Sequence, residues 1–246
     1  MIGGELARTL GPMLILGAVS LWSFEGSWRV MPLGLLVAVM LYFKIRKINV
    51  HEHVEKHNRP ARNYRQYINF FIIITGITVL RSGMSSALTL FLPTFLTSKG
   101  ASLWLAGISL SIFQFAGVFG TLFMGMISDK IGRKKGLLIL AVINPILLFA
   151  FNYSSGFWVY PVLILAGLAH LGFNPIILAL VQERDSKNLS FLNGTYMTIS
   201  FLGSSLMVLT IGYLSDKLGL ALTYDIAGYL AFLVIPFVLM LDNKND

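Results

Sequence analysis

Long apolar runs, each followed by a short polar stretch, dominate the hydrophobic pattern of this chain. A helix needs about 20 apolar residues to cross a hydrocarbon core about 30 Å thick. No run alternates apolar and polar positions with the period of two that a barrel strand requires. The pattern therefore predicts an all-α integral membrane protein with eight transmembrane helices, at residues 6–24, 29–44, 67–97, 103–127, 136–153, 157–181, 190–214 and 220–241.

An eight-residue pattern occurs twice in this apolar background. Gly125-Met-Ile-Ser-Asp-Lys-Ile-Gly132 closes the fourth predicted helix, and Gly212-Tyr-Leu-Ser-Asp-Lys-Leu-Gly219 closes the seventh. Three crossings separate the copies, so we expect them on opposite faces of the membrane. This predicts two three-helix units of opposite topology, the inverted-repeat plan of many membrane transporters.

The composition supports a membrane protein and excludes several other classes. Hydrophobic residues make up 56% of the chain, charged residues 12%, and the mean hydropathy is +0.75, whereas a soluble domain carries about 25% charged residues. The absence of cysteine excludes disulfides and thiolate metal sites. The net charge of +8 lies in the gaps between apolar runs, so it indicates membrane topology and not a nucleic-acid partner.

The basic residues also predict an orientation. If the eight helices cross in turn, most of the 19 Lys and Arg fall on one side, and Arg29, Lys99 and Lys217 fall on the other. The positive-inside rule then places both termini in the cytoplasm of a multi-pass protein of the cell (inner) membrane. The polar stretch at 45–66 is expected to be a cytoplasmic linker. Its His51 and His53 resemble a metal-ligand pair, but without nearby Cys or clustered carboxylates we expect a solvated loop and no metal or cofactor.

Arg81 lies near the middle of the third predicted helix, far from either interface. A mid-membrane Arg costs about 3 kcal/mol on insertion scales and usually faces a cavity or a partner. Two interpretations stand: contact with a substrate, or a structural pairing, for instance with Asp225. Pro93 near the outer end of the same segment predicts a bend or an interruption.

Further polar residues within apolar runs are candidates for function. His170 is either a proton relay or a neutral packing histidine. The polar face of the seventh helix suggests a wall reached by water. The candidate substrate-binding residues are Arg81, Gln114, His170, Asn174, Asn193 and Tyr196; the candidates for proton coupling are Glu5, His170, Glu183 and Asp225.

The stretch Gly125-x-x-x-Asp129-Lys130-x-Gly132-Arg133-Lys134 resembles motif A of the major facilitator superfamily, and the second copy lies where the symmetry of that fold would place it. The resemblance covers essentially the whole chain, which would match family helices five to twelve, without the first four. A looser similarity to the fosmidomycin-resistance branch comes from Gly4 to Pro12, Arg81-Ser82, Phe91-Leu-Pro93, Val181-Gln-Glu183 and Asn193 to Phe201.

This resemblance implies a domain plan and a conformational latch. Residues 1–44 would be the last two helices of an N-terminal bundle, 45–66 the linker, and 67–246 a six-helix C-terminal bundle. Asp129 would pair with Arg133 or lie against the start of the first helix. The implied latch residues are Gly125, Asp129, Lys130, Gly132, Arg133 and Lys134.

The sequence thus predicts a secondary active transporter and not an enzyme. It would export a small anionic compound, such as a fosmidomycin-like drug or an organic acid, by alternating access driven by a proton or other ion gradient. No Gly-x4-Gly-Lys-[Ser/Thr] loop supports ATP-driven transport. The alternative is a truncated or non-transporting membrane fragment that needs a separately encoded N-terminal half.

Overall fold

A computed structural model describes residues 2–46, 64–185 and 188–241. Every regular element in these ranges is helical. Short 3-10 turns at Phe24–Val30, Tyr64–Tyr67 and Gly156–Trp158 precede α2, α3 and α7. The α-helices are α1 (Ile2–Trp22), α2 (Met31–Ile45), α3 (Ile68–Thr89), α4 (Leu92–Ser98), α5 (Leu103–Ile131), α6 (Arg133–Tyr153), α7 (Val159–Arg184), α8 (Leu189–Leu218), α9 (Leu220–Phe232) and α10 (Val234–Leu239).

The all-helical membrane fold predicted from the apolar runs is confirmed. Seven helical segments of the described chain are long and apolar enough to span a bilayer, and the shorter apolar segment Thr9–Trp22 corresponds to the first predicted helix. Two predicted helices are interrupted. The third ends as α3 at Thr89 and resumes as α4, with Pro93 in its first turn, as the proline predicted. The last one breaks at Leu233 between α9 and α10, which was not predicted.

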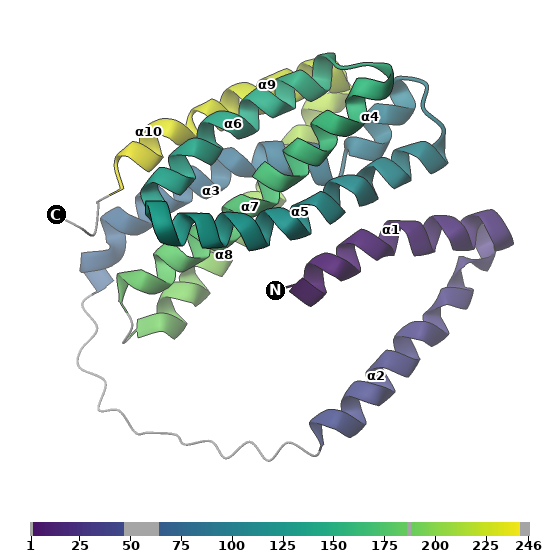
Figure 1. The fold of residues 1–246 in the computed structure, drawn as a ribbon, viewed down its shortest axis with the longest axis horizontal. Helices are drawn as coiled ribbons and strands as arrows, with labels where there is room; N and C mark the ends of the chain where they lie inside the picture. Colours follow the sequence, from purple (N-terminus) through teal and green to yellow (C-terminus); the bar gives the residue numbers. More distant parts are fainter. Residues whose placement is uncertain (1, 47–63, 186–187, 242–246) are drawn as a thin grey trace.

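Helices α3 to α10 form one bundle, α1 lies along α5, and α2 runs away from the bundle (Figure 1). No residue of α2 is buried. In the bundle, α5 and α7 approach each other most closely because glycines face the partner backbone. A Cβ on Gly120 would lie 2.1 Å from the carbonyl oxygen of Leu168, and one on Gly167 would lie 2.2 Å from that of Phe113. Such small-residue contacts let membrane helices pack backbone to backbone.

Two apolar clusters fill the bundle, one toward each end. The first joins the start of α3 to α6, α7 and α10, with Phe70, Ile176 and Val238 among its members. The second lies around α4, where the ring of Phe95 stacks on that of Tyr224 at 4.3 Å between centroids. Tyr224 also donates a hydrogen bond of 2.6 Å to the carbonyl of Ala87. These contacts hold α9 against α4 and α3.

The two copies of the repeated pattern form the same helix-glycine-helix junction. Gly132 has φ 96° and ψ 142°, and Gly219 has φ 82° and ψ 159°, a region open essentially to glycine alone. Each glycine donates a 3.0 Å hydrogen bond to the carbonyl of the serine four residues earlier. The α5–α6 and α8–α9 junctions lie at opposite ends of the bundle (Figure 1), which confirms the inverted three-helix repeats. We call the end that carries Gly132 the basic end.

Candidate functional site

Arg81 lies on α3 inside the bundle and contacts α7. Its Nη2 donates a hydrogen bond of 2.5 Å to the backbone carbonyl of His170. Its guanidinium carbon lies 4.7 Å from the ring centroid of Phe173, a cation–π distance. Its Nε is buried and has no hydrogen-bond partner among the described residues. The guanidinium group thus contacts a carbonyl oxygen and an aromatic ring, and its Nε–H remains free to donate a hydrogen bond.

His170 lies beside Arg81 and is completely buried. In the described part of the chain, neither Nδ1 nor Nε2 has a hydrogen-bond partner. Its ring packs against that of Phe113 on α5, with 6.0 Å between the centroids. Buried polar atoms without partners are rare in native structures and call for an explanation such as a function or a bound water. Both ring nitrogens are therefore candidates for binding a ligand or water.

The other predicted substrate-binding residues lie on neighbouring helices. Tyr196 on α8 packs against the first apolar cluster, and Asn193 lies one helical turn earlier on the same face. The Oδ1 of Asn193 and the Oε1 of the buried Gln114 on α5 have no hydrogen-bond partner among the described residues. Asn174, four residues after His170 on α7, is half-buried. Helices α3, α5, α7 and α8 thus each contribute a polar group to the bundle interior.

Two residues near this site escaped the sequence reasoning. Phe173 supplies the aromatic face under Arg81, and Asn144 on α6 donates a hydrogen bond of 3.4 Å to the carbonyl of Ala169. A signal for Asn144 was present, because Asn144-Pro145-Ile146 repeats the Asn174-Pro-Ile pattern of α7. Phe173 gave no such signal, since one phenylalanine in an apolar helix looks like any other.

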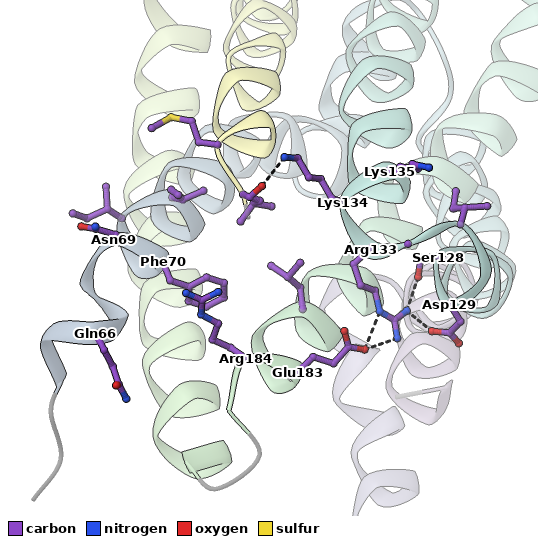
Figure 2. A pocket seen from close by; sticks show the side chains of 17 residues that line it. Gln66, Asn69, Phe70, Ser128, Asp129, Arg133, Lys134, Lys135, Glu183 and Arg184 are labelled. Atoms are coloured by element: carbon purple, nitrogen blue, oxygen red, sulfur yellow. Dashed lines mark hydrogen bonds and ion pairs between the residues drawn. The ribbon is translucent and has the colours of Figure 1, made fainter. Parts of the chain in front are cut away.

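At the basic end, Arg133 joins α5, α6 and α7. It forms an ion pair with Asp129, donates a 2.6 Å hydrogen bond to Ser128 Oγ, and contacts Glu183 Oε1 through Nη2 at 2.9 Å and Nε at 3.1 Å (Figure 2). Of the two positions expected for Asp129, the structure shows the pairing with Arg133. Glu183, a candidate for proton coupling, belongs to this cluster at the end of α7.

The remaining latch candidates surround the same junction. Lys134 donates a 2.6 Å hydrogen bond to the carbonyl of Leu241, and Lys130 is exposed. A Cβ on Gly125 would meet Pro175 Cβ at 3.9 Å, an ordinary contact. A cavity of about 890 Å³ opens here between the start of α3, the α5–α6 junction and the ends of α7 and α10 (Figure 2).

Asp225 lies near the opposite end of the bundle. It accepts hydrogen bonds from Asn152 Nδ2 at 2.7 Å and from the hydroxyl of Tyr153 at 3.0 Å. Lys99 reaches the same region, with Nζ 2.5 Å from the carbonyl of Asn152. The suggested ion pair between Arg81 and Asp225 does not form, because Asp225 pairs with Asn152 and Tyr153. The side chain of Glu5, and both His51 and His53, lie outside the described part of the chain.

Comparisons with known proteins agree with this architecture. The fosmidomycin resistance protein of Escherichia coli (strain K12) is 23% identical over 256 aligned positions, which cover 99% of this chain and 62% of that protein. An uncharacterized MFS-type transporter of Bacillus subtilis (strain 168), YqjV, is 34% identical over 114 positions, or 45% of this chain and 27% of that protein. The chain thus spans less than two thirds of the length of either relative. Because residues 1–207 match the family profile, the chain belongs to the Major Facilitator Superfamily.

Proposed function

We propose that this chain is the substrate-binding part of a secondary active transporter for a small anionic compound. The observation that carries the proposal is the charge of Arg81, which is half-buried inside the bundle. No carboxylate of the described chain forms an ion pair with it, and its Nε remains unpaired. A cation inside a membrane bundle without a counter-ion is costly, and an anionic ligand would supply the missing charge. The name of the Escherichia coli relative, a fosmidomycin resistance protein, favours a phosphonate-like compound and export.

The other candidates receive roles around this charge. Tyr196, Asn193, Gln114 and Asn174 would orient the ligand through their polar atoms. His170 would bind the ligand or carry a coupling proton, while Glu183, Asp225 and Glu5 are further candidates for coupling. Alternating access would then move the ligand across the membrane under an ion gradient.

The cluster around Arg133 is proposed as the conformational latch. Asp129, Arg133 and Glu183 tie the ends of α5, α6 and α7 together at the basic end, which we assign to the cytoplasm, together with both termini. In this proposal, residues 1–44 complete an N-terminal bundle, 45–66 link the two bundles, and 67–246 form the C-terminal bundle. Opening of the cytoplasmic side would require this cluster to rearrange.

Replacing Arg81 tests the proposed substrate class. Everted vesicles containing the protein, and any separate N-terminal half it requires, would be assayed for uptake of a phosphonate and of a cationic drug under a proton gradient. Arg81→Gln should abolish phosphonate uptake, Arg81→Lys should retain part of it, and Arg29→Gln, a charge change at the α1–α2 turn, should leave it unchanged. Undiminished phosphonate binding by a folded Arg81→Gln protein would contradict the proposal.

A second proposal is that the chain needs a separately encoded N-terminal half. It is favoured by α2, none of whose residues is buried and whose exposed side chains are largely apolar, so that helix lacks the packing that the rest of the bundle shows. Co-expression with the product of a neighbouring reading frame of four apolar segments, followed by co-purification, would test it. Transport by the chain alone in proteoliposomes would exclude it.

A further inference from the structure

Three consecutive cations open α6. Arg133, Lys134 and Lys135 occupy its first turn, which contains no acidic residue and no side-chain cap. The N-terminus of a helix carries the positive end of the helix dipole and unpaired N–H groups, and both favour anions. Here the side chains at that end are cations, so they add to the positive charge of the dipole. Asp129 compensates Arg133 through their ion pair. The first turn therefore keeps a net positive charge beside the large cavity.

The cavity of about 890 Å³ has the donors of an anion-binding site. Lys134, Lys135 and Arg184 line it together with the amide side chains of Gln66 and Asn69 (Figure 2). Its two acids, Asp129 and Glu183, are both engaged by Arg133. Lys134 uses one proton toward the carbonyl of Leu241, and an ammonium group has two more to donate. The cavity therefore favours a compact anion with several acceptor oxygens, such as a phosphate group.

An apolar groove begins at the same turn of α3. It has a volume of about 410 Å³ and is lined by Tyr67, Ile68, Phe71, Ile72, Thr75 and Phe191. Ile72 lines the groove and the basic cavity alike. Ile68 and Ile72 are 50% and 58% exposed, and they lie on a segment apolar enough to span the bilayer. The basic cavity thus continues into an apolar groove at Ile72. Such a pair of sites fits a ligand with a charged head and an apolar tail.

We propose that the basic end binds an anionic phospholipid from the adjacent leaflet. The phosphate lies near Lys134 and Arg184, while Lys135 adds positive charge from the other side of α6 (Figure 2). One acyl chain follows the groove past Ile72. Basic pockets between membrane helices bind such headgroups in other proteins. The proposal does not depend on what the protein transports, because the site is separate from Arg81. The bound lipid would lie next to the cluster of Asp129, Arg133 and Glu183.

Native mass spectrometry of the full chain in detergent tests this site. Phosphatidylglycerol and phosphatidylcholine with identical acyl chains would be titrated onto the delipidated protein. The phosphatidylglycerol adduct should persist at collision energies that strip phosphatidylcholine, and its addition should raise the Tm. Each cation contributes about fivefold to the affinity, so Lys134→Gln combined with Lys135→Gln should weaken binding on the order of 20-fold. Lys217→Gln removes a lysine at the opposite end of the bundle, at the position of the second repeat copy that corresponds to Lys130, and should not weaken binding.

Two further arms separate the possible sources of phosphate and keep the test decisive. Glycerol 3-phosphate or inorganic phosphate that raised the Tm as much as phosphatidylglycerol would overturn the lipid assignment in favour of a soluble anion. Thr75→Trp, which fills the groove, should weaken the lipid adduct while leaving the fold intact. If the double lysine variant does not fold, Arg184→Gln replaces it. Equal losses in the variants of the basic end and in Lys217→Gln would show unspecific attraction and overturn the site.

Discussion

The close contact between α5 and α7 predicts that a larger residue at Gly120 destabilises the protein. The atom that a new side chain would meet there is a backbone carbonyl oxygen of α7, which cannot move aside as a side chain can. In Gly120→Ala, the new methyl group would lie 2.1 Å from the carbonyl oxygen of Leu168, whereas ordinary contacts begin near 3.4 Å. The two helices must separate by about 1 Å. Gaps of that size forfeit a quarter to a half of each dispersion contact along the interface. Overpacked cores lose about 1–3 kcal/mol, and we expect the upper end of that range.

The substitution should also disturb the candidate site. Leu168 lies two residues before His170 on α7, so a displaced α7 moves the carbonyl that Arg81 contacts at 2.5 Å. If the chain binds a phosphonate as proposed, that binding should therefore weaken together with the stability. Thermal unfolding in detergent followed by tryptophan fluorescence, together with equilibrium denaturant titration, measures the stability change.

A matched alanine substitution on another helix provides the control. A Cβ on Gly194 of α8 has no atom within 4 Å, and alanine favours the helix over glycine by up to about 1 kcal/mol. Gly194→Ala should therefore keep or raise the Tm. A Gly120→Ala protein within about 0.5 kcal/mol of wild type, or a Gly194→Ala protein destabilised as much as Gly120→Ala, would refute the packing argument.

Three further predictions follow from other contacts. Asp129→Asn should weaken the latch while Arg133 keeps its contacts with Glu183, so cysteines introduced at Gln66 and Lys135 should crosslink at a changed rate; an unchanged rate would contradict the latch. Gly132→Ala and Gly219→Ala should each cost about 1–3 kcal/mol, because both glycines have positive φ. A wild-type Tm in either variant would count against the junction geometry. Tyr224→Phe removes a buried hydrogen bond to Ala87 and should cost about 1–2 kcal/mol, whereas Tyr213→Phe, at a position 64% exposed, should have no effect on Tm.

The sequence predicted the helices well because membrane burial leaves a long and simple signal. The interruption after α3 was also foreseen from Pro93, which occupies the first turn of α4. The break at Leu233 was missed although Pro236 lies close behind it, since an apolar run with one proline near its end fits a single helix equally well. A proline inside an apolar run therefore does not by itself show whether the helix breaks there.

The candidate site was predicted less completely. Arg81 was conspicuous because a charge in an apolar run has no ordinary explanation. Its partner was not predictable, because the group it contacts is the backbone carbonyl of His170, and every residue has such a carbonyl. The pairing of Asp129 with Arg133 was one of the two expected positions. The turn at Gly132 brings Arg133, the first residue of α6, next to Asp129 at the end of α5. The contact with Glu183 needed the fold, which brings the end of α7 to the α5–α6 junction.

The two glycine junctions separate what stereochemistry preserves from what side chains add. Gly132 and Gly219 share one backbone geometry, yet Arg133-Lys-Lys follows the first and Leu220-Ala-Leu follows the second. The two junctions therefore have the same backbone geometry and differ in the charge of the residues that follow it. A glycine is thus enough to build the turn between two helices at either end of the bundle, and the three residues after it are free to set the local charge.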